Sequence, residues 1–396
     1  MDRAELVELL SPEGLRLLDS LPAWDTTADV VKTVADLRRQ GHPPGLVATV
    51  LSQSKLRARA AAKFGEFASR MLFTEAGLEQ ATRRRVAALH AGRYARAGIE
   101  HVADLGCGIG GDALALAAID LEVTAVEADE ITAAIAAYNL TPFPRVRVLH
   151  ARAEDVSLSG IGGAFLDPAR RTTAGGTTRR IADAAEYSPS LDFAFGLADR
   201  LPVGVKLGPG TDRRVIPAGA EAQWISVDGD VLELGVWQGA VARPGVGRAA
   251  LVVRGESAAE LTAPADSEDA PVGPIGDYIY EPDGAVIRAR LIGDLARANG
   301  AWMLSPGIAY LTTDTEFESP FARGFRVLEH LPADERQLRQ ALHARGVGTL
   351  EIKKRGVDVD PAALRTRLKL RGDESATIVL TRESGRHVAL LVERLG

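Results

Sequence analysis

The stretch Asp104-Leu-Gly-Cys-Gly-Ile-Gly-Gly-Asp112 follows a short apolar run, His101 to Leu105, and precedes a segment rich in alanine and leucine. Within it, Gly106, Gly108 and Gly111 have the spacing G-x-G-x-x-G. In doubly wound α/β proteins this spacing marks the turn from a strand into a helix, where the backbone approaches a ligand closely. The stretch therefore predicts a parallel sheet with crossover helices and a ligand-binding loop at its edge.

The sequence around this loop alternates as such a sheet requires. After Gly98, short apolar runs alternate with Ala-rich helical segments. An antiparallel pair, Ala222 to Val227 and Val231 to Val236, is predicted because the intervening Asp228-Gly229 favours a tight hairpin turn. The expected fold class is α/β, with a doubly wound Rossmann-like core. The predicted parallel strands are His101–Leu105, Glu122–Glu127, Arg145–His150, Gly163–Asp167 and Val203–Leu207.

Two other regions flank the predicted core. Apolar residues at three- and four-residue spacing predict N-terminal helices at Ala4–Leu10, Val30–Arg39, Leu56–Met71 and Glu79–Ala97. Thr262 to Gly276 is rich in Pro, Ala, Asp and Gly without periodicity, which is typical of a linker. Beyond it we expect a small α+β domain that includes a helix over Ala285 to Asn299. The expected division is a helical region 1–97, an α/β domain 98–262, a linker 263–275 and a C-terminal domain 276–396.

Composition narrows the classes of protein to which the chain can belong. Cys107 is the single cysteine, which rules out an internal disulfide and a multi-cysteine zinc site. The seven histidines lack ligand-like spacing, so we expect no metal. No apolar run reaches the roughly eighteen residues of a membrane-spanning helix, and the N-terminal sequence lacks the basic and then apolar layout of a signal peptide. The protein is expected to be cytoplasmic, without a membrane partner.

Asp104 distinguishes between two ligands that the glycine spacing fits equally well. A dinucleotide enzyme uses such a loop to hold a pyrophosphate, with an acid such as Glu127 on the ribose. Asp104 stands at the carboxyl end of the predicted strand, so its carboxylate would face the ligand at close range. A negative charge there repels a pyrophosphate and suits the ammonium and sulfonium of S-adenosylmethionine. We therefore expect S-adenosylmethionine as the cofactor, with a nicotinamide-dependent oxidoreductase as an alternative.

Other residues of the expected cofactor site follow from the same strand order. Glu127 ends the next strand, and its two oxygens can accept hydrogen bonds from both ribose hydroxyls. After the third strand, either Glu154 or Asp155 is expected to meet the adenine amino group; the residues do not decide between them, and Asp155 is the candidate carried forward. Cys107 is expected to be a small packing residue. The glycines expected to pass close to the methionine portion are Gly106, Gly108 and Gly110.

The predicted fourth strand ends in a second motif, Ala164-Phe-Leu-Asp-Pro-Ala-Arg-Arg171. Asp167 and Pro168 fall opposite the expected methyl donor. There, a similar [Asp/Asn]-Pro-Pro-[aromatic] turn of amino-group methyltransferases directs a side-chain oxygen and a backbone carbonyl at the target amine. Both are candidate catalytic residues, although no aromatic residue follows them to stack on a base. Arg170 or Arg171 is expected to stack on a base or to hold a phosphate instead.

Five segments are informative in combination: Phe73-Thr-Glu-Ala-Gly-Leu-Glu-Gln-Ala-Thr82, Asp104 to Asp112, Phe165-Leu-Asp-Pro-Ala-Arg-Arg171, Lys206-Leu-Gly-Pro-Gly210 and Leu350-Glu-Ile-Lys-Lys-Arg-Gly356. Together they resemble bacterial class I methyltransferases with a C-terminal THUMP-like domain, a family distantly similar to trimethylguanosine synthase. In that synthase a Phe-Ser/Thr segment before the core helps to wrap the cofactor, so the resemblance implies this role for Phe73 and Thr74. The synthase's Pro-Pro-Trp turn is absent here, so its specificity for a guanine amine is not carried over.

The C-terminal part carries a local excess of basic residues, although the whole chain has a formal net charge of -6. From Glu351 to Arg371 there are seven Lys or Arg against three acids. THUMP domains are associated with RNA binding, so the resemblance implies that Lys353, Lys354 and Arg355 contact RNA phosphates; a solvated charged surface is the alternative. The leading interpretation is an S-adenosylmethionine-dependent methyltransferase acting on RNA. A non-catalytic RNA-binding module with a vestigial cofactor pocket is a further alternative.

Overall fold

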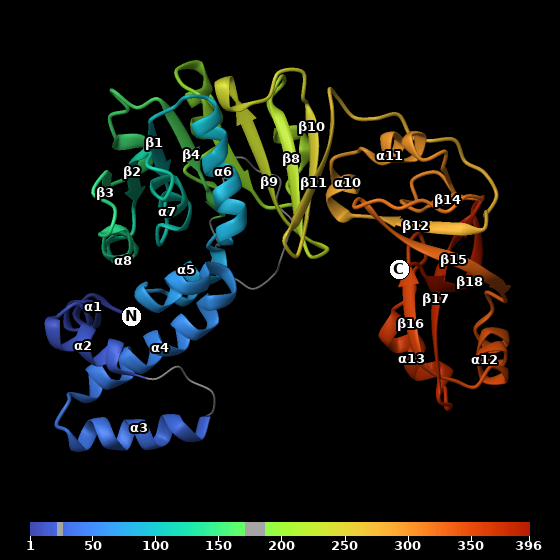
Figure 1. Cartoon of the computed structure of the whole chain (residues 1–396), viewed down its shortest axis with the longest axis horizontal. Helices are drawn as coiled ribbons and strands as arrows, with labels where there is room; N and C mark the ends of the chain where they lie inside the picture. The colour runs from blue at the N-terminus through green and yellow to red at the C-terminus, as the bar shows by residue number, and fades with distance from the viewer. Residues whose placement is uncertain (22–26, 171–186) are drawn as a thin grey trace. The chain divides into compact units, whose positions relative to one another are not determined.

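The computed structural model describes residues 1–21, 27–170 and 187–396 (Figure 1). The chain divides into two compact units. The first comprises Met1–Leu207, Asp212–Ala218 and Val236–Ala242, and the second comprises Gly208–Thr211, Gly219–Gly235 and Arg243–Gly396. The expected division at residues 97, 262 and 275 stays a prediction.

Helices form the start of the first unit, but two of them end earlier than the periodicity suggests. Of the predicted helix Leu56–Met71, only residues 56–64 are α-helical, as the last part of a longer helix. That helix ends at Phe64 because Gly65 takes a positive φ of 59° and a 3-10 turn follows. The predicted helix Glu79–Ala97 is two helices, separated at residues 81–83. The elements are α1 (Arg3–Leu9), α2 (Pro12–Ser20), α3 (Thr27–Arg39), α4 (Pro44–Phe64), the 3-10 helix η1 (Gly65–Arg70), α5 (Glu75–Gln80) and α6 (Arg84–Arg96).

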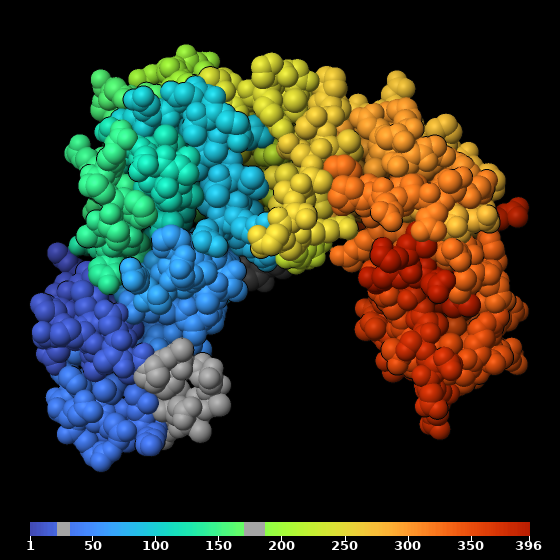
Figure 2. All heavy atoms as spheres, in the orientation of Figure 1, coloured from blue at the N-terminus to red at the C-terminus, as the bar shows by residue number. Residues whose placement is uncertain are grey.

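The N-terminal helices share a core with the sheet domain that follows them. Leu9 of α1, Leu18 of α2 and Val50 of α4 are buried in one apolar cluster, which also contains Ile109 of the glycine-rich stretch and Ala113 just after it. Figure 2 shows the outer surface of these helices in dark to mid blue. Among the described helices, none has both the length and the apolar composition needed to cross a membrane.

A parallel sheet forms the centre of the first unit. Its strands are β1 (His101–Leu105), β2 (Glu122–Glu127), β3 (Val146–His150), β4 (Gly163–Leu166) and β7 (Val203–Leu207), and its helices are α7 (Gly111–Ala117), α8 (Glu130–Leu140) and α9 (Leu191–Gly196). β1 pairs in parallel with β2 and β4, β2 with β3, and β4 with β7, which gives the order β7-β4-β1-β2-β3. This confirms the predicted doubly wound fold. Because the strand order reverses at β1, the loop after β1 lies at the switch point where such sheets bind ligands.

Local signals explain where the crossover helices begin. Gly110 immediately precedes α7 and takes a φ of 90°, in the left-handed region that favours glycine. The Asp129 carboxylate caps α8 by accepting a hydrogen bond from the backbone amide of Thr132. β4 is buried along its whole length, as is typical of an inner strand with helices on both faces.

Four further strands follow β7. They are β8 (Glu221–Val227), β9 (Asp230–Gln238), β10 (Arg248–Arg254) and β11 (Ser257–Ala263), in the order β11-β10-β8-β9. The predicted hairpin is confirmed, since β8 and β9 are neighbours and Asp228 and Gly229 between them take positive φ angles of 54° and 95°. β10 pairs in parallel with β8 and antiparallel with β11.

The C-terminal part of the second unit is a small α+β domain, as predicted. The predicted helix Ala285–Asn299 is two short helices, because Arg290 between them takes a φ of 60°. The elements are β12 (Tyr278–Pro282), α10 (Gly284–Arg288), α11 (Ile292–Ala298), β13 (Trp302–Met303), β14 (Leu311–Thr313), β15 (Ala322–Leu331), α12 (Glu335–Ala344), β16 (Val347–Lys354), α13 (Pro361–Leu368), β17 (Glu374–Glu383) and β18 (Arg386–Arg394). The strands lie in the order β13-β14-β12-β15-β18-β17-β16. Leu338 of α12 and Leu364 of α13 share a buried core with Ile352 of β16.

Asn139 of α8 fastens the N-terminal region to the glycine-rich loop. Its side-chain oxygen accepts a hydrogen bond from the Leu72 amide at 2.7 Å, and its side-chain nitrogen donates to the Leu72 carbonyl at 3.0 Å and to the Ile109 carbonyl at 2.9 Å. The residue is 5% exposed, so water cannot replace these bonds. One buried amide therefore sets where residues 72–74 lie relative to the loop after β1.

Replacing Asn139 with Ala is expected to destabilise the protein by about 2–4 kcal/mol, because one buried amide and two buried carbonyl groups lose their partner. Unfolding in urea, followed by circular dichroism, measures this change. Asn299→Ala is the matched control, since the Asn299 side chain donates a single hydrogen bond, to the carbonyl of Leu295 within its own turn. Equal losses of stability in the two variants would contradict the role given to Asn139.

Candidate active site

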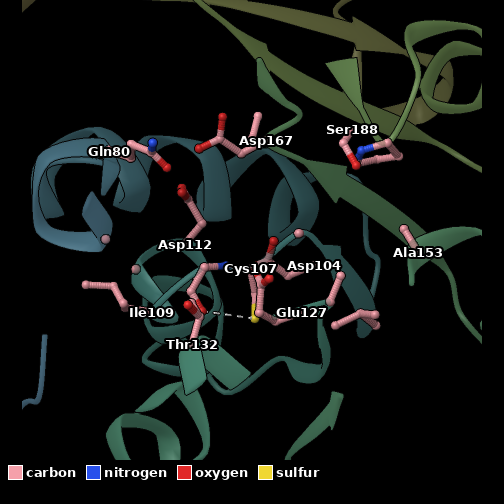
Figure 3. Close-up of a pocket in the computed structure, with 18 of the residues that line it drawn as sticks. Gln80, Asp104, Cys107, Ile109, Asp112, Glu127, Thr132, Ala153, Asp167 and Ser188 are labelled. Atoms are coloured by element: carbon pink, nitrogen blue, oxygen red, sulfur yellow. Dashed lines mark hydrogen bonds between the residues drawn. The ribbon is translucent and has the colours of Figure 1, made fainter. Parts of the chain in front are cut away.

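A cavity of about 290 Å³ lies at the carboxyl edge of the parallel sheet, beside the loop after β1 (Figure 3). Figure 3 shows Glu127 and Thr132 at one end of this cavity, and Gln80 and Asp167 at the other. We call these the Glu127 end and the Asp167 end. The lining residues come from the segments 74–82, 104–112, 126–132, 151–154, 167–169 and 188–189.

Asp104 is the next-to-last residue of β1 and lies in the cavity wall between the two ends. Its side chain is 1% exposed, and one of its carboxylate oxygens, Oδ2, has no hydrogen-bond partner in the described structure. Burial raises the pKa of Asp104 well above its usual range, and the nearby charges of Asp112 and Asp167 act in the same direction. An unpartnered buried carboxyl group at the edge of a cavity is suited to bind a cationic group of a ligand.

The glycine-rich loop brings its backbone against the cavity. Gly106 and Gly108 line it and take positive φ angles of 90° and 54°, which only glycine adopts readily. The predicted Gly110 does not line the cavity: it precedes α7, and Gly111 lines the wall instead. Cys107 is buried, and burial raises the pKa of its thiol well above the ordinary value, so it is a packing residue as expected rather than a thiolate nucleophile.

Glu127 presents a fixed carboxylate at the end of β2. Its Oε2 accepts a hydrogen bond from the Gly108 amide at 3.0 Å and its Oε1 from the Asp129 amide at 2.9 Å. After β3, Glu154 lines the cavity, whereas Asp155 is exposed and lies outside the lining. Of the two acids expected near an adenine, Glu154 is therefore the one beside the cavity, and which of them meets an adenine stays a prediction.

The segment before α5 contributes one of its two predicted residues to the cavity. Thr74 lines it and caps α5, since its hydroxyl accepts a hydrogen bond from the Gly77 amide at 2.9 Å. Phe73 does not line it: its ring is fully buried against Phe64, and its amide and carbonyl bond to the side chain of Gln53. Phe73 therefore anchors Thr74 and does not itself face the cavity.

At the Asp167 end, a chain of polar contacts runs from the cavity into the interior. The Lys206 ammonium forms an ion pair with the Asp167 carboxylate and donates to the Thr82 hydroxyl at 3.0 Å. That hydroxyl donates to Asp112 Oδ2 at 2.6 Å, and Asp112 Oδ1 lies 2.9 Å from His90 Nδ1. Burial alone would raise the pKa of Asp112, but the hydrogen bond and charge of His90, with Lys206 and Thr82, hold it below its usual value.

The other residues predicted near Asp167 contribute less to the described site. Pro168 is buried and is not part of the cavity lining, whereas Ala169 on its far side is. The side chain of Arg170 and the whole of Arg171 lie outside the described residues. Ser188, which pairs with Ala169 across a two-stranded ladder, completes this wall and was not predicted. Within the described residues, no group of three or more His, Cys, Asp or Glu side chains is arranged to hold a metal ion.

Lys206 and Thr82 are the functional candidates that sequence reasoning missed. A signal for Lys206 was present: Leu166 of β4 pairs with Val205 of β7, so the next residues along these parallel strands, Asp167 and Lys206, reach the same edge. A lysine inside an otherwise apolar predicted strand could have indicated this. Thr82 had no comparable signal, because its place depends on the break between α5 and α6.

The three C-terminal cations predicted to bind phosphate differ in their surroundings. Lys353 and Arg355 each lie 3.5 Å from a carboxylate oxygen of Glu281, and Lys353 lies at the same distance from Glu351. Lys354 is exposed. Two of the three charges are thus neutralised within the domain, so Lys354 is the candidate that remains open to a phosphate.

Known proteins resemble this chain over nearly its whole length. The family model of the THUMP domain-like group matches residues 322–394, and a domain of unknown function (DUF8688) matches residues 2–60. Two Mycobacterium tuberculosis proteins, of strains CDC 1551 / Oshkosh and ATCC 25618 / H37Rv, are described as uncharacterized S-adenosylmethionine-dependent methyltransferases. Each is 36% identical over 353 residues, which cover 86% of this chain and 92% of the relative. A crystal structure from Porphyromonas gingivalis W83, described as a methyltransferase, aligns over 100% of both chains with a TM-score of 0.76 and 21% identity, which shows a shared fold.

A doubly wound sheet with an acid-lined cavity at its switch point defines the class I methyltransferase architecture. Given this similarity, the chain belongs to the S-adenosylmethionine-dependent methyltransferases. The family decides between the two ligands that the glycine spacing left open, in favour of S-adenosylmethionine. The residues present fit that cofactor, because the unpartnered oxygen of Asp104 suits its ammonium group and Glu127 presents a fixed carboxylate for its ribose.

Proposed function

We propose that this methyltransferase acts on RNA. The observation that carries the proposal is the THUMP domain-like match over residues 322–394, since THUMP domains are associated with RNA binding. The exposed Lys354 on this domain supplies a charge suited to phosphate. The acceptor-binding part of the first unit is, in this proposal, the Asp167 end of the cavity.

In this proposal the cofactor and the acceptor bind in different parts of the cavity. Asp104 would hold the ammonium of S-adenosylmethionine, Glu127 its ribose hydroxyls and Glu154 the adenine side. The cofactor supplies an electrophilic methyl group on a sulfonium. Asp104 and Glu127 contribute position rather than acid–base chemistry, because methyl transfer to a well-placed lone pair depends mainly on orientation and exclusion of water.

Asp167 orients the acceptor. Its carboxylate lines the cavity, where it can accept a hydrogen bond from an acceptor N–H or O–H and so direct the lone pair of that atom. Lys206 holds this carboxylate in place, and the Thr82 hydroxyl holds Lys206. The acceptor's proton passes to Asp167 as the new bond to carbon forms. No described residue forms a base-stacking platform here, so the proposal names no particular nucleobase.

Comparing RNA from a strain with and without the gene tests the proposal. Nucleosides from digested total RNA are compared by mass spectrometry, and the RNA of the deletion strain is then treated with purified enzyme and S-adenosylmethionine carrying a labelled methyl group. We expect one methylated nucleoside to be missing and then restored. Unchanged nucleosides with no transfer of label would refute RNA as the substrate. Cofactor binding without transfer to any RNA would instead favour the non-catalytic RNA-binding alternative.

A further inference from the structure

A basic rim borders the Asp167 end of the cavity. Gln80, Ala81 and Thr82 line the cavity there, in the break between α5 and α6. Arg83 and Arg84 follow directly and begin α6. The break that places them is unexpected from the sequence, where residues 79–97 look like one continuous helix.

Lys63 of α4 holds this break in position. Its ammonium donates to the carbonyls of Leu78, Glu79 and Ala81 at 2.7, 2.7 and 3.0 Å. These carbonyls end α5, so the ammonium caps the helix and fixes the chain that leads into Arg83. Lys63 thus adds a third cation to the rim; we call Lys63, Arg83 and Arg84 the rim cations.

The rim cations lie close enough together to affect one another. Burial lowers the pKa of Lys63, and the charges of Lys206 and Arg83 lower it further against the opposing charge of Glu79. The guanidinium of Arg84 lies over Gly65 at the end of α4, 3.7 Å from where a Cβ of that residue would be. Within the described residues, neither Arg83 nor Arg84 forms an ion pair with an acid. Positive charge is therefore concentrated at this border, and the charge of Glu79 opposes it at Lys63.

Acidic side chains line the cavity at both ends, with Asp112 and Asp167 at the Asp167 end and Glu127 at the other (Figure 3). These acids suit a cationic cofactor and repel phosphate. Arg83 and Arg84 follow Thr82 in the chain and lie outside the lining. A phosphate is therefore repelled from the cavity itself and attracted to the cations at its border.

We propose that Arg83 and Arg84, supported by Lys63, form a phosphate-binding subsite for the backbone of the nucleic-acid strand that carries the acceptor. The inference rests on the proposed function and deepens it: Arg83 and Arg84 bind a phosphodiester group next to the acceptor nucleotide. The subsite positions the strand and carries no sequence information, as is usual for contacts to phosphate.

The double charge reversal Arg83→Glu with Arg84→Glu tests this subsite. Acids at the start of α6 agree with the helix dipole, so the fold is expected to be kept. The matched control is Arg38→Glu with Arg39→Glu, which changes the net charge equally on two exposed arginines at the end of α3. Binding of the full chain to a fluorescently labelled, mixed-sequence oligoribonucleotide is followed by anisotropy at several salt concentrations, in the presence of S-adenosylhomocysteine.

We expect the Arg83/Arg84 reversal to weaken binding by about tenfold or more and to lower the salt dependence of log K by about 1.4, the value for two lost contacts to a single strand. The Arg38/Arg39 control should change affinity less than about threefold, and Arg83→Lys with Arg84→Lys should retain most of it. Cofactor binding, measured by calorimetry, should be the same in all variants. The proposed subsite is overturned if the Arg83/Arg84 and Arg38/Arg39 reversals lose affinity for RNA equally, or if the Arg83/Arg84 reversal loses none.

Two further measurements separate this inference from the proposed function. Inorganic phosphate and a mononucleotide are added as competitors, and we expect only an RNA strand to displace the labelled oligoribonucleotide at micromolar concentration. If no RNA accepts a methyl group while the rim reversal still abolishes strand binding, the proposed function fails and the subsite stands. If RNA is methylated with an unchanged KM in the rim reversal, the proposed function stands and the subsite fails.

Discussion

Asp104→Asn is expected to weaken the binding of S-adenosylmethionine by about 100-fold or more, while making the ligand-free protein more stable at neutral pH. The affinity falls because an amide cannot balance the ammonium of the cofactor, and removing one partner of a buried, hydrogen-bonded charge pair typically costs about 2–5 kcal/mol. The stability rises because Asp104 is 1% exposed and one of its oxygens has no partner. The substitution keeps the shape of the side chain and removes its charged form.

The pH dependence gives the sign of the stability change. Because burial raises the pKa of Asp104, the fold favours its protonated form. That contribution is complete below the pKa of an unfolded aspartate, about 3.9, and is lost as the pH rises through the raised pKa. At a pH near the pKa of an unfolded aspartate, the melting temperature of Asp104→Asn should therefore match that of the parent. As the pH rises above that value, the melting temperature of the variant should exceed that of the parent by an increasing amount. Asp155→Asn, an exposed residue outside the cavity, is the control and should show no such gap.

Cofactor affinity should show the complementary trend. A cation bound against Asp104 requires the ionised carboxyl, so binding releases a proton wherever the free protein holds one. Affinity for S-adenosylmethionine is expected to increase with pH and then level off, whereas Asp104→Asn should show no such rise. Calorimetry in buffers of different ionisation enthalpy measures the released proton. The role of Asp104 would be contradicted if Asp104→Asn bound S-adenosylmethionine as tightly as the parent, or if it were less stable than the parent at every pH.

The two buried aspartates of the cavity thus have pKa values that are shifted in opposite directions. Asp112 is surrounded by His90, Thr82 and Lys206, which keep its pKa low, and it serves as a permanent charge in the wall. Asp104 has one oxygen without a partner, and its burial together with the charges of Asp112 and Asp167 outweighs the charge of Lys206, so its pKa is raised. Pairs of acids whose environments separate their pKa values commonly divide roles in active sites. Here one acid orders the site and the other is available for the ligand.

The sequence was sufficient to predict the sheet and the loop after β1, because both depend on local signals. Apolar runs, glycine spacing and the Asp228-Gly229 turn each act within a few residues, and the structure confirms them. The break between α5 and α6 was missed because a distant residue, Lys63, caps it. The neutralisation of Lys353 and Arg355 by Glu281 was missed for the same reason, since β12 and β16 are not neighbours in the sheet and these side chains approach one another only in the folded domain.

Asp167→Asn is expected to lower the rate of methyl transfer to RNA by about 100-fold or more, a typical loss when a positioned acid–base group is removed. The amide keeps the shape of the side chain but cannot take the acceptor's proton, and it no longer forms an ion pair with Lys206. Transfer of labelled methyl groups to RNA from the deletion strain measures the rate. Affinity for S-adenosylmethionine should change less than about threefold, because Asp167 lies at the opposite end of the cavity from Glu127 (Figure 3).

Two further variants test whether the lower rate of Asp167→Asn arises from its contact with the acceptor. Asp155→Asn makes the same chemical change outside the cavity and should leave the rate unchanged. Lys206→Met leaves the Asp167 carboxylate without its cation, so the rate should fall while its dependence on pH shifts, which a purely structural effect would not produce. An active Asp167→Asn enzyme would remove Asp167 from the mechanism. A loss of cofactor binding in that variant would instead place Asp167 in the cofactor site, and the division of the cavity into two ends would then be wrong.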